Sequence, residues 1–210
     1  MNMPGSKITA WWCRCIVFSA LCGSGTALSG TALAQEVYVC VWRNPERTMT
    51  RLFPEAKDYR TVTVRLTPDA LARIEKRAGA VLLPGQREQY QYFEMLAGDG
   101  KVIGHTQAMT QKGEFGAIEF VFGMDLQGRI NGLYIQRQRE RDKGFREEAF
   151  LAKFHGISVA DADALGDPAG DAGSIGTRAV TLGVRKALIE FDELVLKNPA
   201  RSQATADGKK

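Results

Sequence analysis

The chain has 210 residues, a length that allows one domain or two small ones, and its 28 Lys and Arg against 24 Asp and Glu give a formal net charge of +4. With 44% hydrophobic and 25% charged residues, the composition is that of a globular protein and excludes wholesale disorder. The small charge, without a stripe of Lys or Arg and interleaved aromatic residues, argues against a nucleic-acid partner.

The first 34 residues have the order of a secretory signal peptide. Lys7 and Arg14 are its charges, residues 15–34 carry none, and an A-x-A sequence at residues 32–34 provides a cleavage signal. Two alternatives remain open: a lipoprotein through Cys22, and an uncleaved anchor, although a span needs about 20 mostly apolar residues and many here are Gly, Ser or Thr. We expect cleavage, export to the periplasm and a mature chain that starts at Gln35.

Four elements are expected in the next part of the chain. Pro54 ends the first helix, and Thr67 opens the second as N-cap, with Pro68 at the first helical position and Gly79 at the end. The strand before Thr67 alternates and is rich in β-branched residues. The elements are a strand at 37–42, a helix at 45–53, a strand at 59–66 and a helix at 68–79.

Four adjacent strand candidates follow, joined by short turns that contain glycine. Short turns between successive strands favour an antiparallel sheet. The strands are expected at 89–97, 101–109, 115–124 and 130–138. The predicted fold class is therefore α+β, with a curved antiparallel sheet packed by helices.

The last third of the chain is expected to contain two helices, one at 144–154 and a long one at 177–197 with apolar residues at helical spacing. A loop rich in Gly, Ala and Asp lies between them. The expected organisation is a signal peptide at 1–34, an N-terminal α/β segment at 35–95 that packs on the core, an FMN-binding domain at 96–199 by the resemblance described below, and a disordered tail at 200–210.

The segment directly before the long helix is the most informative one for function. Residues 171–177 read DAGSIGT, with two glycines and two hydroxyl residues. A helix N-terminus presents unpaired N–H donors, so a phosphate group is physically favoured at residues 173–177. The alternative is structural: Thr177 is the N-cap and the glycines only turn the chain.

This segment resembles the flavinylation motif of the FMN-binding domain family, found in the flavin subunits of the bacterial sodium-pumping quinone reductase and the related Rnf electron-transport complex. In that family a threonine after small residues, shortly before a long helix, carries FMN through a phosphoester. Upstream segments match the family in order and spacing, so the resemblance covers about half the chain. They are residues 98–104, 116–130, 139–144 and 150–156.

The resemblance puts Ser174 in the place of the flavin-bearing threonine and makes Thr177 the rival acceptor. The glycines are expected to leave room for the flavin, and the N–H groups of residues 175–178 to bind its phosphate. The loop at 139–144 is expected beside the flavin, with Glu140 replaceable by alanine without loss of the fold. The implied cofactor site consists of Gly173, Ser174, Ile175, Gly176, Thr177, Glu140 and Gly144.

The function implied by the resemblance is that of an exported FMN protein, an electron-transfer carrier rather than a stand-alone enzyme. Its implied partners are a Mg-dependent flavin transferase, a redox protein that the sequence does not name, and a membrane-associated electron-transport complex. One alternative is an FMN-binding-like module without covalent flavin that serves as a partner-binding or accessory domain. Another is an unrelated exported domain in which the loop is only a helix cap.

Other candidate sites are weaker. The acidic residues at 161, 163, 167 and 171 lack the spacing of an EF-hand and indicate a solvated loop. His105 and His155 have no clustered Cys to complete a zinc site, so no metal is expected. The basic run at 137–146 is either a solvated turn or a cation cluster for phosphate or an acidic redox partner.

Overall fold

The computed structural model describes residues 45–166 and 173–197, all of which belong to one compact unit that spans Glu36–Lys210. The signal peptide expected at 1–34, the strand expected at 37–42 and the tail expected at 200–210 lie outside the described residues. Within the described ranges, no helix combines the length and the apolar character that crossing a bilayer requires.

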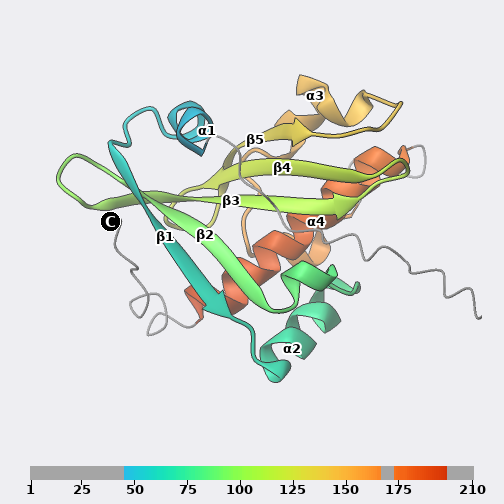
Figure 1. The fold of residues 1–210 in the computed structure, drawn as a ribbon, viewed down its shortest axis with the longest axis horizontal. Helices are drawn as coiled ribbons and strands as arrows, with labels where there is room; N and C mark the ends of the chain where they lie inside the picture. Colours follow the sequence, from blue (N-terminus) through green and yellow to red (C-terminus); the bar gives the residue numbers. More distant parts are fainter. Residues whose placement is uncertain (1–44, 167–172, 198–210) are drawn as a thin grey trace, which may run out of the picture. The chain divides into compact units, whose positions relative to one another are not determined.

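Five antiparallel strands form one open sheet in which each strand pairs with its neighbour in sequence (Figure 1). The α+β prediction is confirmed, and the strand expected at 59–66 joins the four expected later ones in the same sheet. The expected division at residue 95/96 falls inside the second strand. The strands are β1 (Asp58–Arg65), β2 (Gln89–Leu96), β3 (Val102–Lys112), β4 (Ala117–Met124) and β5 (Ile130–Arg137).

The helix α2 (Pro68–Ala78) begins and ends where the sequence predicts. The side chain of Thr67 accepts a hydrogen bond from the N–H of Ala70 at 3.2 Å, as an N-cap does. Gly79 ends the helix with a φ of 64°, a left-handed conformation that costs glycine little. Both signals are local, which explains why the sequence alone was sufficient.

The long helix α4 (Ile175–Phe191) continues into a five-residue π-helical stretch, Asp192–Leu196. It packs across β3 and β4 and against α2, as Figure 1 shows. Val180, Val184 and Leu188 are completely buried and belong to the main core. The predicted start at Thr177 is wrong by two residues, because Ser174 is the N-cap.

A second, smaller core lies on the opposite face of the sheet. It is made by α1 (Pro45–Leu52) and the residue after it, Phe53, which pack against β2 and β4. Phe53 lies so close to Gly104 of β3 that a Cβ there would stand 2.3 Å from its ring. The members are Met49, Leu52, Phe53, Phe93, Met95 and Val121.

The single helix expected at 144–154 is wrong. The backbone of Glu147 is extended, with φ −65° and ψ 137°, and this interrupts the helical path. Its apolar residues are nevertheless buried as predicted, with Phe145 and Phe154 fully so. The segment consists of η2 (Gly144–Arg146), α3 (Glu148–Leu151) and η3 (Ala152–Phe154), and two further short turns are η1 (Pro84–Gln86) and η4 (Ala162–Ala164).

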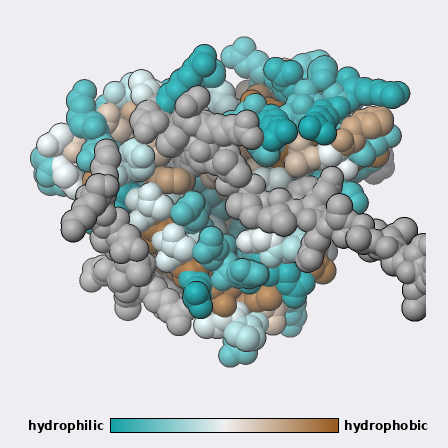
Figure 2. All heavy atoms as spheres, in the orientation of Figure 1, coloured by the Kyte–Doolittle hydropathy of each residue, from teal (hydrophilic) through white to brown (hydrophobic). Residues whose placement is uncertain are grey.

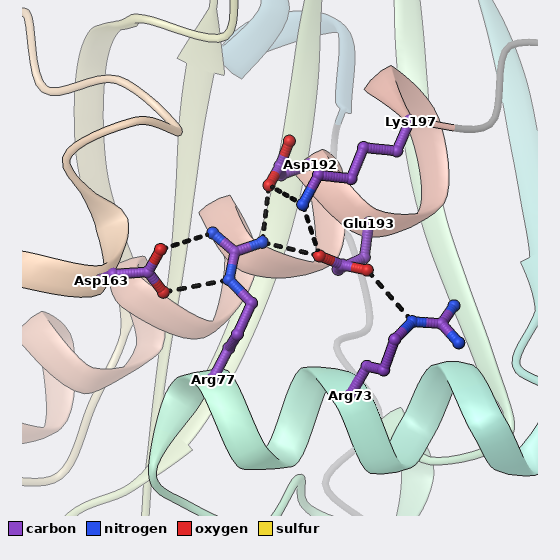
Figure 3. A network of polar contacts seen from close by, with 6 residues as sticks. All are labelled: Arg73, Arg77, Asp163, Asp192, Glu193 and Lys197. Carbon is purple, nitrogen blue, oxygen red and sulfur yellow. Dashed lines mark hydrogen bonds and ion pairs between the residues drawn. The ribbon is translucent and has the colours of Figure 1, made fainter.

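A cluster of charges ties α2 to the end of α4 (Figure 3). The guanidinium of Arg77 donates to Asp163 at 2.8 and 3.0 Å, to Asp192 at 2.5 Å and to Glu193 at 2.8 Å. Hydrogen bonding to Arg77 lowers the pKa of Asp163. Burial alone would raise the pKa of Glu193, but hydrogen bonds from Lys197, Arg77 and Arg73 outweigh it and lower that pKa.

We predict that Arg77→Met lowers the free energy of unfolding by about 1–3 kcal/mol at pH 7, because it leaves the half-buried carboxylates unpaired. Lowered carboxyl pKa values mean that this stabilisation is present above the usual values of 3.8 and 4.5 and is lost as the pH falls through the lowered ones. Urea denaturation of both proteins at pH 7 and pH 3 measures the difference. The exposed pair of Lys101 and Asp99 supplies a control, Lys101→Met, and an equal loss in both variants would contradict the prediction.

Candidate functional site

Ser174 forms the N-cap at the start of α4. Its backbone is extended, with φ −69° and ψ 166°, and its hydroxyl oxygen accepts a hydrogen bond from the N–H of Thr177 at 3.2 Å. The hydroxyl of Thr177 in turn donates to the carbonyl of Ser174 at 2.8 Å. The two hydroxyl residues three positions apart therefore both close the first turn, and the prediction that Thr177 is the cap is wrong.

The free donors of this helix start are fewer than the sequence indicated. The N–H of Thr177 binds the Ser174 hydroxyl, and the N–H of Arg178 binds the Ser174 carbonyl at 3.1 Å. In the described part of the chain, the N–H groups of Ile175 and Gly176 have no acceptor. A phosphate group at this end therefore has two backbone donors available, not four.

The loop at 139–144 lies against this helix start through Asp142. The Ser174 hydroxyl donates a hydrogen bond to the carboxylate of Asp142, which is the main cause that lowers the pKa of Asp142. The N–H of Gly144 donates to the same carboxylate at 3.0 Å and further lowers that pKa. Asp142 was not among the predicted site residues, because its partner is distant in sequence and no local spacing connects the two.

Glu140 has a different role from the one expected. Its carboxylate is buried and accepts hydrogen bonds from the N–H groups of Glu114 and Phe115, both at 3.0 Å. Gly113 lies beside it, where a Cβ would stand 2.3 Å from a carboxylate oxygen. Glu140 therefore holds the turn between β3 and β4, and the expectation that its replacement leaves the fold intact is contradicted by these bonds.

The space expected around Gly176 is filled. A Cβ at this position would stand 2.3 Å from the ring of Phe145, which is completely buried. Gly176 is therefore a close-packing residue between α4 and η2, and it leaves no room for a flavin on that side. Gly173 stays half-buried at the helix start, where its carbonyl accepts from the guanidinium of Arg178.

Positive charge and two apolar side chains surround the Ser174–Asp142 contact. Arg141 stacks on the ring of Phe115 at 4.8 Å, and the ammonium of Lys143 donates to the carbonyl of Glu140 at 2.6 Å. Phe115 and Ile175 are large hydrophobic residues that remain 42% and 43% exposed. The end of the molecule that carries Ser174 thus offers cations and apolar surface together.

The weaker sequence candidates do not form a site. Asp161 accepts from the Ser158 hydroxyl at 2.7 Å and Asp163 pairs with Arg77, while residues 167 and 171 lie outside the described residues. His105 is buried between Tyr92 and Phe191, and burial lowers its pKa. Across the described ranges, no three His, Cys, Asp or Glu side chains gather as a metal ion would require.

Comparison with known proteins finds no matching family model and no matching curated protein. Two solved structures are similar. NqrC of Shewanella oneidensis shares 13% identity over 77% of this chain and 91% of its own, with a TM-score of 0.42. A subunit of the Na⁺-translocating NADH-quinone reductase of Parabacteroides distasonis shares 17% over 76% and 87%, with a TM-score of 0.45. Both are subunits of the kind that the sequence resemblance names.

We predict that Glu140→Ala lowers the free energy of unfolding by about 2–4 kcal/mol, because two turn N–H groups lose a charged acceptor. Glu88→Ala, which truncates an exposed glutamate, is the matched control and should change stability by less than about 0.5 kcal/mol. Thermal or urea denaturation of both variants tests this. A Glu140→Ala protein as stable as wild type would show that the turn does not depend on this carboxylate.

Proposed function

We propose that this chain is an exported flavoprotein that carries electrons on FMN, with the flavin joined to Ser174 through a phosphoester. The observation that carries the proposal is the contact of the Ser174 hydroxyl with the Asp142 carboxylate at the N-terminus of α4. It joins the two segments that the family resemblance singles out, the small-residue motif and the loop at 139–144. The flavin would supply the redox chemistry, and the protein would bind and orient it.

The contact suits ester formation. The new bond joins the Ser174 oxygen to phosphorus, and the hydroxyl proton must leave. Asp142 is ionised at neutral pH because its pKa is lowered, and it already accepts that hydroxyl proton in a hydrogen bond. A carboxylate in this position can act as the base for the serine.

The product is favoured by its surroundings. A phosphodiester at Ser174 would lie at the positive end of the helix dipole, near the free N–H groups of Ile175 and Gly176. The exposed guanidinium of Arg178 lies one turn further. Esterification removes the hydrogen bond to Asp142 and brings two negative groups together, so the fully exposed carboxylate of Asp142 must turn away.

Thr177 is the poorer acceptor. Its side chain is buried, and its hydroxyl proton is already donated to the Ser174 carbonyl at 2.8 Å. An ester there would have to break the first turn of α4. Ser174 is therefore the one of the two hydroxyl residues that we assign to the flavin.

A second reading has its own support. The Ser174 oxygen is used as the helix cap, and Phe145 fills the space beside Gly176, so the site suits a chain that binds FMN without a covalent bond or only contacts a partner. Such a module would be an accessory domain of the same fold. Denaturation separates the readings, because covalent flavin stays with the chain and loose flavin is released.

The remaining parts of the proposal follow from the sequence. The N-terminal charges, the apolar run and the A-x-A signal support export to the periplasm and a mature chain from Gln35. Outside the cytoplasm a dissociated flavin would be lost, which favours a covalent bond. We propose a flavin transferase and a membrane-associated electron-transport complex as the partners.

The decisive test is coexpression with a Mg-dependent flavin transferase, followed by intact-mass measurement. Wild type and Thr177→Ala should gain the mass of FMN minus water, and Ser174→Ala should not. Because alanine removes the cap and costs about 1 kcal/mol, Ser174→Asn is the matched variant that keeps a capping oxygen without a hydroxyl. Flavinylated Ser174→Asn, or wild type that never gains the mass, would refute the assignment.

We further predict that Asp142→Asn slows flavinylation about 100-fold, which is the usual contribution of a general base. Asparagine keeps an acceptor for the Ser174 hydroxyl and for the N–H of Gly144, so the loop should keep its conformation. The rate of mass gain at fixed transferase concentration measures the effect. Asp125→Asn, which changes a carboxylate in the turn before β5, should leave the rate unchanged.

A further inference from the structure

A pocket of about 510 Å³ lies along the outer edge of β5, on elements that the flavin site does not use except for η2. One wall is β5 itself, and the others come from α1, η2, α3 and η3. Its volume is in the range of sites that bind ligands. The lining residues are Arg51, Gly132, Leu133, Tyr134, Ile135, Arg146, Glu148, Leu151, Ala152 and His155.

The edge of β5 is only partly covered. β5 is the last strand of the sheet, and the chain near residues 156–159 pairs with its beginning, where Ile130 exchanges bonds of 2.8 Å with Ile157 and Gly156. From Gly132 to Ile135 the outward backbone groups bind no other backbone within the described ranges. Alternate residues of an edge strand direct both N–H and C=O outward, so this stretch is an open template for another strand.

The pocket is positively charged. Arg51 and Arg146 are exposed and form no ion pair with any described residue. The guanidinium of Arg51 stacks on the ring of Tyr134 at 3.9 Å, which holds it at the pocket. Glu148 is the one carboxylate of the lining. Figure 2 shows mainly hydrophilic residues over the α3 region, with a few hydrophobic ones beside them.

We propose that this pocket docks an extended, acidic segment of a partner protein, which adds to β5 as a sixth strand. A peptide supplies the row of N–H and C=O groups that the open edge lacks, and the two arginines select acidic side chains on it. Four paired residues span about 13 Å. Leu151 and Ala152 offer apolar surface to the side chains that alternate with the acidic ones.

A small anion suits the pocket less well. It would neutralise Arg51 and Arg146 but would leave the backbone groups of residues 132–135 without partners. The inference goes beyond the flavin carrier function and does not depend on flavin attachment, since none of the lining residues is Ser174 or Asp142.

The test uses the full chain and a capped heptapeptide in which valine alternates with glutamate. Calorimetry should give a dissociation constant below about 1 mM, and amide exchange should slow at residues 132–135. The same peptide with lysine in place of glutamate, and the acidic peptide with alternate backbone nitrogens methylated, should each bind at least ten-fold more weakly. Equal binding of the methylated peptide would overturn strand addition, and no binding at 1 mM would overturn the site.

Protein variants locate the site. The double substitution Arg51→Glu and Arg146→Glu should weaken binding at least ten-fold without changing the fold, as circular dichroism would report. Arg65→Glu reverses an exposed arginine on the opposite edge strand, β1, and is the matched control that should leave binding unchanged. A larger loss with Arg65→Glu would move the docking site to β1, and glutarate that displaces the peptide at equal concentration would identify a small-anion pocket instead; either result refutes the proposal.

Discussion

The close approach of α4 to its neighbours determines where the candidate site stands. Gly176 and Gly183 lie two turns apart on the same side of the helix, and a Cβ at either would stand 2.3 Å from Phe145 or 2.5 Å from Phe120. Both rings are completely buried. Because any larger residue would push the helix away, these two glycines set the position of α4, and with it the position of Ser174 against the loop at 139–144.

The same helix is held by charges at its other end and along its buried side. Arg77 binds Asp192 and Glu193 where α4 gives way to the π-helical stretch. Lys186 donates to the carbonyl of Val81 at 2.6 Å, and burial raises the pKa of Glu190, one turn later, to about 8. With its middle and its C-terminal end anchored in this way, α4 has little freedom to move when its first turn changes.

The sequence predicted best what local chemistry decides. Thr67, Pro68 and Gly79 are each sufficient to place one end of α2, and alternation placed the strands to within a few residues. The start of α4 was missed because Ser174 and Thr177 are both good caps, and packing of Gly176 against Phe145 favours the earlier one. The sequence carried no signal for the Asp142 contact or for the buried role of Glu140, since both depend on partners distant in the chain.

Ser174 therefore combines two functions that compete for one oxygen. As N-cap it accepts from the N–H of Thr177, and as hydroxyl it donates to Asp142. An ester at this oxygen removes the proton that Asp142 binds but keeps an oxygen at the cap position, with phosphate charge favoured at the same helix end. Since α4 is anchored elsewhere, the loop at 139–144 is the part that must move. Glu140 limits that movement, because its bonds to Glu114 and Phe115 hold the beginning of the loop on the β3–β4 turn while exposed Asp142 swings out.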